Sequence, residues 1–267
     1  MDGIKPFLKW AGGKRWLVSQ HKEIFPRDCN IYYEPFLGSG AVYFALAPQT
    51  AFLSDSNRTL VDTYQAIKAN WQSVVKHLRK HQANHCTEYY YQIRQNCPQG
   101  LYARAARFIY LNRTCWNGLY RVNLHGVFNV PIGTKSNVLS PDDDYGQISD
   151  LLQSAKLRCL DFECVTDRAT EGDFVYIDPP YTISHSNNGF IKYNELLFRW
   201  SDQVRLRDAV LRAVSRGAKV VISNAFHPAV ADLYKDSFEL HVISRTSRLS
   251  GKTAGRKKGN EYLIVGV

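Results

Sequence analysis

Short apolar runs alternate along the chain with longer stretches in which apolar residues recur at helical spacing. Runs rich in β-branched and aromatic residues predict strands at 31–36, 51–55, 156–161, 174–179, 218–224, 238–244 and 261–267. Between several of them, the periodic positions predict helices at 41–47, 57–70 and 202–216. Strands that alternate with helices indicate an α/β fold with a mainly parallel sheet covered on both faces.

This alternation stops between about residues 75 and 155. A helical pattern at 101–113 is followed there by a loop rich in Gly, Asn and Pro, from 112 to 141. We interpret the stretch as a helical insertion that carries a recognition loop, which divides the chain into 1–74, 75–155 and 156–267. Near the end, the basic segment 245–259 predicts a hairpin loop before the last strand, and a contact with phosphates is left open.

Charge narrows the class of partner. The 267 residues include 34 Lys and Arg against 24 Asp and Glu, a formal charge of +10 that suits a polyanion such as nucleic acid or an acidic membrane surface. The six cysteines form no C-x-x-C pair, so neither a zinc site nor a disulfide framework is expected. The N-terminus has no apolar signal-peptide core, and no apolar run approaches the ~20 residues that cross a bilayer, so we expect a soluble cytoplasmic protein without a metal.

The strand predicted at 174–179 ends in a carboxylate, Asp178, followed by Pro179, Pro180 and Tyr181. A carboxylate and a backbone carbonyl can accept both hydrogens of an aromatic amino group and so localise its lone pair toward an electrophile. The prolines restrict the backbone that presents these acceptors, and the tyrosine can stack on the ring. The carboxyl ends of strands are also where open α/β sheets bind ligands, so this segment is the predicted catalytic site.

The segment after this motif, 182–199, carries Phe190 and Tyr193. It is expected either to close over a bound base or to be an ordinary surface loop.

A second motif, "EPFLGSG" at 34–40, joins a predicted strand to a helix. Gly38 and Gly40 let the backbone pass close beneath a ligand, while Tyr43 stands where a dinucleotide-binding site would need its third glycine. Asp55 ends the following strand, where a carboxylate can accept both hydroxyls of a ribose or simply cap the next helix.

A third motif, "FLKWAGGKR" at 7–15, resembles the end of a phosphate-binding loop. Arg15 replaces the Ser or Thr that would bind magnesium, and Leu8 replaces the early glycine, so that interpretation fails. What remains is an aromatic residue, Trp10, a flexible turn and the cation Lys14, which suit a ligand with an adenine face and a carboxylate tail.

Six blocks in one order resemble Dam-type (alpha-class, D12) DNA adenine-N6 methyltransferases: "FLKWAGGK", "EPFLGSG", "LSDSN", "NRTCWNGLYRVN", "GVFNVPIG" and "DPPYTISHSNNGFIKY". The resemblance runs from near the first residue to the last strand. It implies a seven-stranded Rossmann-like sheet of the S-adenosylmethionine-dependent methyltransferases, with a helical target-recognition insertion. It further implies that S-adenosyl-L-methionine is the cofactor and that an adenine flips out of double-stranded DNA, with GATC the expected site. We expect a monomer in the cytoplasm of a bacterial or phage-infected cell.

The resemblance also implies roles for individual residues. The positions that match cofactor-binding residues are Trp10, Ala11, Lys14, Phe36, Gly38, Gly40, Asp55, Asp161, Phe162 and Asp178. The catalytic positions are Asp178, Pro179, Pro180 and Tyr181. The DNA-binding positions are Lys9, Trp116, Asn117, Leu119, Arg121, Pro131 and Lys135. Among these, Arg121 matches a reader of the first guanine, and Trp116 an aromatic that inserts where the adenine departs.

Two departures from the family pattern concern DNA reading. The chain has Thr134-Lys135-Ser136 where close members carry an aromatic residue and a basic pair, which affects reading of the last base. Trp116 is bulkier than the tyrosine common at its position.

Other functions remain as alternatives: methylation of a different adenine-containing site, of RNA, of cytosine N4 or of a glutamine side chain, or non-catalytic DNA binding by the same fold. Asp178 favours adenine over the cytosine-N4 and glutamine enzymes. A NAD-dependent oxidoreductase is disfavoured by Tyr43 and by the motif at 178–181.

Overall fold

The computed structural model describes residues 4–10, 12–26, 28–118, 120–123, 126–181, 198–246 and 258–266. The chain folds into two compact units. The first comprises Met1–Lys22 and Leu37–Cys159, and the second comprises Glu23–Phe36 and Leu160–Val267. The three-part division at residues 75 and 155 stays a prediction.

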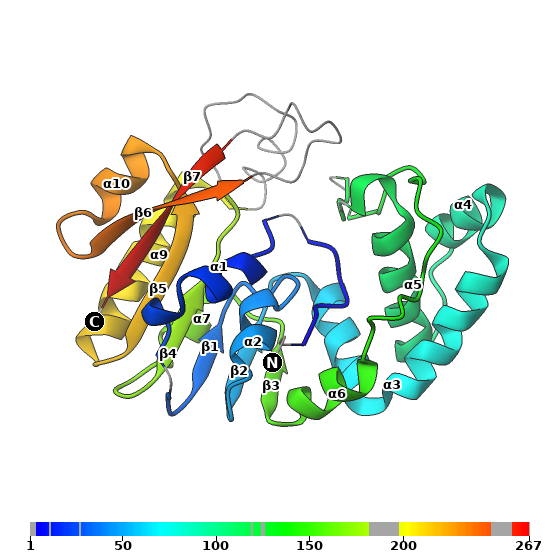
Figure 1. Ribbon diagram of the computed structural model, residues 1–267, viewed down its shortest axis with the longest axis horizontal. Coiled ribbons are helices and arrows are strands. Elements are labelled where there is room, and N and C mark those ends of the chain that lie inside the picture. The colour runs from blue at the N-terminus through cyan, green and yellow to red at the C-terminus, as the bar shows by residue number, and fades with distance from the viewer. Residues whose placement is uncertain are drawn as a thin grey trace. The chain divides into compact units, whose positions relative to one another are not determined.

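The strands form a seven-stranded sheet in the order β3-β2-β1-β4-β5-β7-β6. Their bounds are β1 Tyr32–Glu34, β2 Ala51–Ser54, β3 Ala155–Arg158, β4 Phe174–Ile177, β5 Lys219–Ala225, β6 Glu239–Thr246 and β7 Lys258–Gly266 (Figure 1). β2 pairs with β3, β1 with β4 and β4 with β5 in parallel, whereas β7 runs antiparallel to both β5 and β6. The α/β fold and all seven strand positions predicted from the sequence are confirmed.

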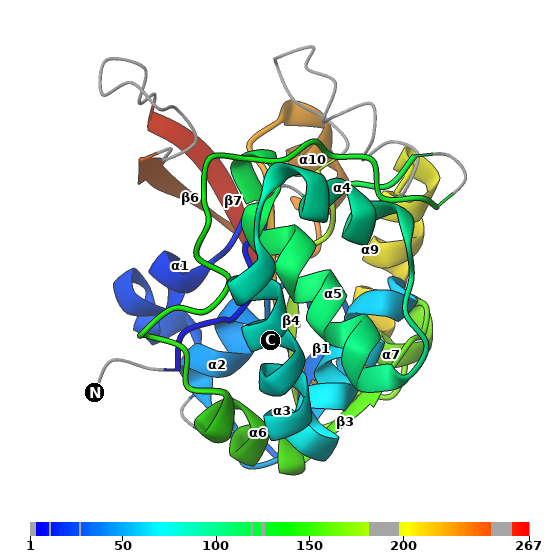
Figure 2. The same ribbon diagram turned by 90° about the vertical axis from the view of Figure 1, so that its right-hand side faces the viewer.

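Helices make up most of the first unit. They are α1 Arg15–Gln20, α2 Ala41–Leu46, α3 Arg58–Asn84, α4 Thr87–Gln95, α5 Leu101–Thr114 and α6 Tyr145–Gln153, together with a 3-10 turn, η2, at Trp116–Gly118. Figures 1 and 2 show α3, α4 and α5 lying side by side, with α3 and α5 in extensive contact. Every residue of α5 from Phe108 to Thr114 is buried, so this end of the helix is packed on all sides, consistent with the apolar residues in the pattern that predicted the helix.

A break divides α3 near its middle. Asn70 has φ −163° and ψ 83°, and its side chain accepts a hydrogen bond of 2.9 Å from the N–H of Ser73. This contact caps the second half of the helix, as asparagine does at a helix start. The helix predicted at 57–70 therefore ends where the structure bends, and a second helical stretch follows without an intervening loop.

The second unit contains three further helices among its described residues: α7 Phe162–Thr166, α9 Trp200–Ser215 and α10 Pro228–Tyr234. A short 3-10 turn, η1 at Lys22–Ile24, lies where the chain passes from the first unit to the second. α9 buries Leu206, Ala209, Val210 and Ala213 and contacts both α7 and β5. In the described part of the chain, every helix is too short or too polar to cross a lipid bilayer.

Candidate active site and nucleic-acid interface

The predicted catalytic segment follows directly from β4, whose four residues are all buried. The next residue, Asp178, is half-buried, and its Oδ1 accepts a hydrogen bond of 2.7 Å from the hydroxyl of Ser223. Ser223 is fully buried on β5, and its Oγ lies 3.1 Å from the hydroxyl of Tyr176. Because β4 and β5 pair in parallel with Ile177 opposite Ile222, the register itself brings Asp178 to Ser223. The carboxylate is thus fixed at the carboxyl end of a buried strand.

Tyr181 is held three residues further on. Its hydroxyl donates a hydrogen bond of 3.2 Å to Oε2 of Glu261 on β7. Burial, together with the negative charges of Asp178 and Glu261, raises the pKa of Tyr181 well above its ordinary value, so the side chain remains a neutral phenol at physiological pH. Pro179 between these residues is buried, and Pro180 is half-buried.

The segment 182–197, with Phe190 and Tyr193, lies outside the described residues.

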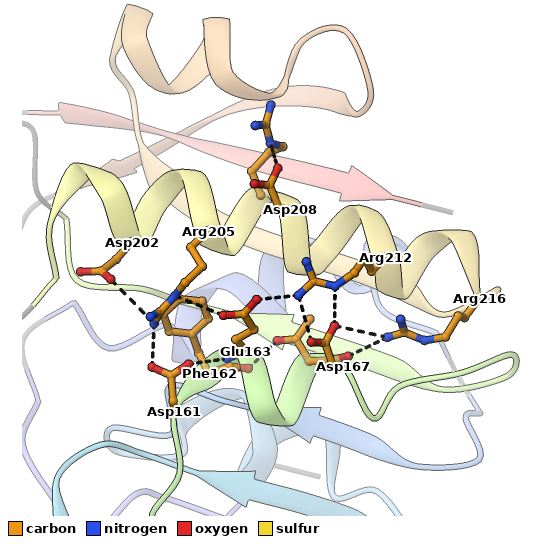
Figure 3. A network of polar contacts seen from close by, with 11 residues as sticks. Asp161, Phe162, Glu163, Asp167, Asp202, Arg205, Asp208, Arg212 and Arg216 are labelled. Carbon is orange, nitrogen blue, oxygen red and sulfur yellow. Dashed lines mark hydrogen bonds and ion pairs between the residues drawn. The ribbon is translucent and has the colours of Figure 1, made fainter.

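Three predicted cofactor residues of the second unit lie together. The rings of Phe36 and Phe162 are stacked, with centroids 5.4 Å apart and planes at 21°, and Phe198 meets both edge-on. Asp161 caps α7: its Oδ1 accepts the N–H of Glu163 at 3.0 Å, while its Oδ2 forms an ion pair of 2.7 Å with Arg205 (Figure 3). An aromatic wall beside a carboxylate is suited to a planar base with an amino group.

The glycine loop of the first unit is tied to the end of β2. Asp55 accepts the N–H of Gly38 at 3.0 Å on Oδ2 and the N–H of Asn57 at 2.9 Å on Oδ1. Burial raises the pKa of Asp55, and these two hydrogen bonds oppose the shift. Gly38 has φ +48° and Gly40 φ +64°, a region that favours glycine. Asp55 therefore fixes the shape of the loop in addition to its predicted role with a ribose.

Trp10 packs directly on this loop. A Cβ built on Gly38 would lie 2.8 Å from Cδ1 of Trp10, so a side chain at that position would displace the indole. Trp10 also stacks on Tyr120, with centroids 6.1 Å apart and planes at 14°. Lys14 is buried just before α1. Ala11 lies outside the described residues. The glycine turns, the indole and Asp55 fit a nucleoside cofactor, since they combine a flat apolar surface with a hydroxyl acceptor.

Most of the predicted DNA-binding residues are exposed, namely Trp116, Asn117, Arg121, Pro131 and Lys135. For Trp116 the exposed fraction is 53%, which is unusual for so large an apolar side chain. Its backbone N–H donates a hydrogen bond of 2.9 Å to the carbonyl of Pro131, which joins two parts of the predicted recognition loop. Leu119 lies outside the described residues.

Lys9 is the half-buried member of this set. Its Nζ donates to the carbonyl of Arg113 at 3.0 Å, and a Cβ on Gly118 would lie 2.6 Å from its Cδ. Burial lowers the pKa of Lys9, and the nearby charges of Lys135 and Arg113 lower it further. The structure therefore places Lys9 against the beginning of the recognition loop and within electrostatic range of Lys135.

Sequence reasoning missed the residues that hold this region in place. Asn112, fully buried at the end of α5, accepts the N–H of Lys9 at 2.9 Å and donates to the carbonyl of Lys9 at 2.7 Å. Arg113 donates two hydrogen bonds to the carbonyl of Phe7 and forms an ion pair with Asp143. The sequence signal that could have found them is that two polar residues, Asn112 and Arg113, end the apolar pattern of the helix predicted at 101–113.

The recognition loop has a second support on α4. The hydroxyl of Tyr90 donates to the carbonyl of Val130 at 2.9 Å, and Arg94 donates to the carbonyls of Asn129 and Val130 at 3.3 Å. Tyr90 is fully buried, and burial raises its pKa above the usual range. These contacts fix the backbone next to Pro131.

Among the described residues, no group of three or more His, Cys, Asp or Glu side chains is arranged to hold a metal ion.

Comparison with known proteins places these features in a family. The model of the D12 class N6 adenine-specific DNA methyltransferases matches residues 10–249. The chain is 37% identical to the Type II methyltransferase M1.LlaDCHI of Lactococcus lactis subsp. cremoris, covering 98% of this chain and 95% of that protein. It is 33% identical to the DNA adenine methylase of Escherichia coli strain K12, covering 99% and 96%.

Among solved structures, the precorrin-6y C5,15-methyltransferase from Geobacter metallireducens covers 95% of this chain and 86% of its own at 10% identity. The TM-score of this pair is 0.38. The match over most of the chain and the extent of the relatives carry the conclusion: the chain belongs to the D12 class N6 adenine-specific DNA methyltransferases.

Proposed function

We propose that this adenine-specific DNA methyltransferase uses S-adenosyl-L-methionine to methylate N6 of the adenine in GATC, after that adenine has left the stack of double-stranded DNA. The observation that carries the proposal is Asp178 at the carboxyl end of β4, fixed by Ser223 and followed by Tyr181 on Glu261. An amino group in front of this segment would meet an acceptor whose position is already set.

Each unit by itself contains residues proposed to bind the cofactor. In the first unit these are Trp10, Lys14, Gly38, Gly40 and Asp55, with Asp55 accepting the ribose hydroxyls. In the second unit, Phe36, Asp161 and Phe162 would flank the adenine of the cofactor. When bound, S-adenosyl-L-methionine supplies a methyl group activated by its positive sulfur.

The protein's part in the chemistry is to localise the lone pair on N6. Asp178 and the carbonyl of Pro179 accept the two amino hydrogens, and Tyr181 stacks on the base. The neutral phenol keeps charge away from the face of the base, because its pKa lies far above physiological pH. Such preorganised acceptors require no strongly basic side chain, since positioning provides much of the rate.

We assign recognition of the DNA sequence to exposed residues of the recognition loop. Arg121 can donate two hydrogen bonds to a guanine in the major groove, and Trp116 can occupy the space that the flipped adenine leaves. Asn117, Pro131, Lys135 and Lys9 would contact the rest of the site. The exposure of Trp116 supports this role, because a buried indole could not enter DNA.

The relatives suggest the setting. The Lactococcus lactis protein is a Type II methyltransferase, and the Escherichia coli protein is a DNA adenine methylase. We propose site-specific modification of cellular DNA as the role, beside a restriction enzyme or without one. Double-stranded DNA is the macromolecular partner, and we propose that the active form is a monomer.

The reaction can be tested with short duplexes. Tritium from S-adenosyl-L-[methyl-³H]methionine should enter a duplex with one GATC and remain in its adenine as N6-methyladenine. Duplexes in which one base pair of the site is replaced should react much more slowly. Label in cytosine, or equal labelling of all duplexes, would contradict the proposal.

Replacement of Arg121 provides a more specific test of base recognition. Arg121→Ala should reduce discrimination at the first guanine by about 1–3 kcal/mol, because a bidentate contact to that base is lost. The measurement is kcat/KM on GATC against a duplex with that guanine replaced. A uniform loss on every duplex would instead make Arg121 a phosphate contact.

A further inference from the structure

An ion-pair network joins α7 to α9 in the second unit. Figure 3 shows the acids of the α7 segment, Asp161, Glu163 and Asp167, facing arginines of α9. Among the described residues, Arg212 forms ion pairs with Asp167 at 2.9 Å and with Glu163 at 2.7 Å. The contacts of Arg212 join the two helices without involving a predicted cofactor residue.

Arg205 differs from Arg212 in what it touches. Its Nη2 lies 2.7 Å from Oδ2 of Asp161, and its Cζ lies 4.4 Å from the centroid of the Phe162 ring. It also approaches Glu163 at 3.4 Å and Asp202 at 3.7 Å. One guanidinium therefore contacts both members of the Asp161-Phe162 pair, and the ring it covers is the one that stacks on Phe36.

The planar guanidinium suits this double contact. Arginine can pair with a carboxylate in its plane and place its face on an aromatic ring, whereas the ammonium of lysine is a compact point charge. Asp161 also accepts the N–H of Glu163 through its other oxygen, so both oxygens of the carboxylate have a defined direction. Arg205 thereby fixes the carboxylate relative to the ring.

We infer that Arg205 is a positioning residue for the adenine of the cofactor, acting through Asp161 and Phe162 without touching the cofactor itself. This inference rests on the proposed function. Asp161 can accept the amino hydrogens of adenine, but it would face the carbonyl oxygen of hypoxanthine, which is itself an acceptor. The orientation of Asp161 therefore controls selectivity for the amino group.

Folding stability is a poor explanation for the arrangement. The side chains of Arg205 and Asp161 are 41% and 46% exposed, and ion pairs at such exposure contribute little to stability. Arg212, at 43% exposure, has a similar setting and serves as the matched control. An effect on cofactor binding that is seen on replacing Arg205 but not on replacing Arg212 would therefore reflect the contacts of Arg205 with Asp161 and Phe162.

The test compares Arg205→Ala, Arg205→Lys and Arg212→Ala in the full chain. Calorimetry would measure binding of S-adenosyl-L-homocysteine and of S-inosyl-L-homocysteine, and thermal unfolding would measure stability. Arg205→Ala should weaken binding of the adenosyl ligand roughly tenfold and reduce the ratio between the two ligands. For Arg205→Lys, the affinity for the adenosyl ligand and the ratio between the two ligands should lie between those of Arg205→Ala and the wild type. Arg212→Ala should leave both affinities unchanged.

The outcomes separate the two proposals. If the wild type binds S-adenosyl-L-homocysteine but Arg205→Ala and Arg212→Ala weaken it equally, the positioning role is wrong. An unchanged ratio between the two ligands in Arg205→Ala would also overturn it. If the wild type binds neither ligand, the proposed function fails, and this inference fails with it.

Discussion

Asp178 illustrates how the end of a strand can fix the position of a candidate catalytic residue. Its side chain follows four buried residues of β4, and the pairing with β5 supplies Ser223 as a hydrogen-bond donor. Partial burial of a carboxylate is unfavourable unless the carboxylate is hydrogen-bonded, and the hydrogen bond from Ser223 offsets part of this desolvation free energy. The arrangement makes Asp178 a fixed acceptor.

Replacement of Asp178 should separate chemistry from binding. Asp178→Ala is expected to lower kcat for methyl transfer by about 10²–10³-fold, as for loss of a preorganised electrostatic contact, while duplex affinity changes little. Single-turnover kinetics and fluorescence anisotropy measure the two quantities. Ser223→Ala should give a smaller loss, since the carboxylate remains. Unchanged turnover in Asp178→Ala would remove this residue from the reaction.

Asp55 shows what single-residue reasoning could and could not predict. Its place at the end of a strand predicted a ligand contact, with helix capping as the alternative. The structure adds a third role, because Asp55 accepts the N–H of Gly38 and so shapes the glycine loop. That contact could not be predicted, since it depends on the left-handed turn at Gly38.

At the scale of elements, the sequence located strands better than their ends. β7 begins at Lys258, three residues before the predicted start, although Lys258-Gly259-Asn260 gives no apolar signal. Backbone pairing with β6 continues to Thr246 opposite Lys258, so the hairpin extends the strand beyond its apolar part. Similarly, α5 continues to Thr114, so the recognition loop begins later than residue 112.

The two hydrogen bonds between Asn112 and the backbone of Lys9 predict a measurable effect on stability. Asn112→Asp keeps the acceptor for the N–H of Lys9 but replaces the donor to the carbonyl of Lys9 with a second oxygen. The free energy of unfolding should fall by about 1–3 kcal/mol or more, because a buried polar group loses its partner. Urea unfolding measures this change.

The same variant should weaken duplex binding, because Lys9 and the start of the recognition loop share this support. Asn96→Asp is the matched control, since Asn96 makes an exposed contact at the end of α4. If both variants behave alike in unfolding and in DNA binding, Asn112 has no special positioning role.

A histidine between helices predicts how stability depends on pH. His81 of α3 stacks on Tyr110 of α5 and contacts the hydroxyl of Tyr89 at 2.9 Å. Burial, with the charges of His77 and Arg107, lowers the pKa of His81 from 6.5 to about 4. The folded protein therefore binds fewer protons than the unfolded chain between these values, and His81 makes stability fall as the pH decreases through this range.

Chemical unfolding at several pH values between 4 and 7 would measure this dependence. A single group contributes at most about 1.4 kcal/mol per pH unit to the slope. In His81→Phe, which keeps an aromatic ring in the stack, the contribution of His81 should disappear. An identical pH dependence in the wild type and the variant would show that His81 does not titrate as described.

For the whole molecule, the formal charge of +10 predicts that DNA binding depends steeply on salt. Lys135 is exposed and lies near Lys9, so Lys135→Ala should reduce the slope of log K against log salt by about 1. Lys235→Ala serves as the control, because Lys235 pairs with Asp232 at the surface of the other unit. Equal slopes for the wild type and Lys135→Ala would exclude a phosphate contact at this lysine.

Also at this scale, the fold and the residues of the candidate site were far more predictable than their supports. Strand ends and motifs were enough to propose Asp178, Asp55 and the glycine loop as candidates. Ser223, Glu261, Asn112 and Arg205 act on residues 45, 80, 103 and 44 positions away, so their roles arise only from tertiary packing. A local pattern contains no information about such contacts.

The central claim can be tested most directly by single-molecule sequencing of unmethylated genomic DNA after incubation with the protein and S-adenosyl-L-methionine, with Asp178→Ala as the control. The account predicts N6-methyladenine confined to GATC with the wild type and far less N6-methyladenine with the variant in the same incubation. N6-methyladenine at a different site would keep the chemistry and place the error in the recognition loop. Absence of N6-methyladenine from all DNA, or equal methylation by Asp178→Ala, would contradict the account.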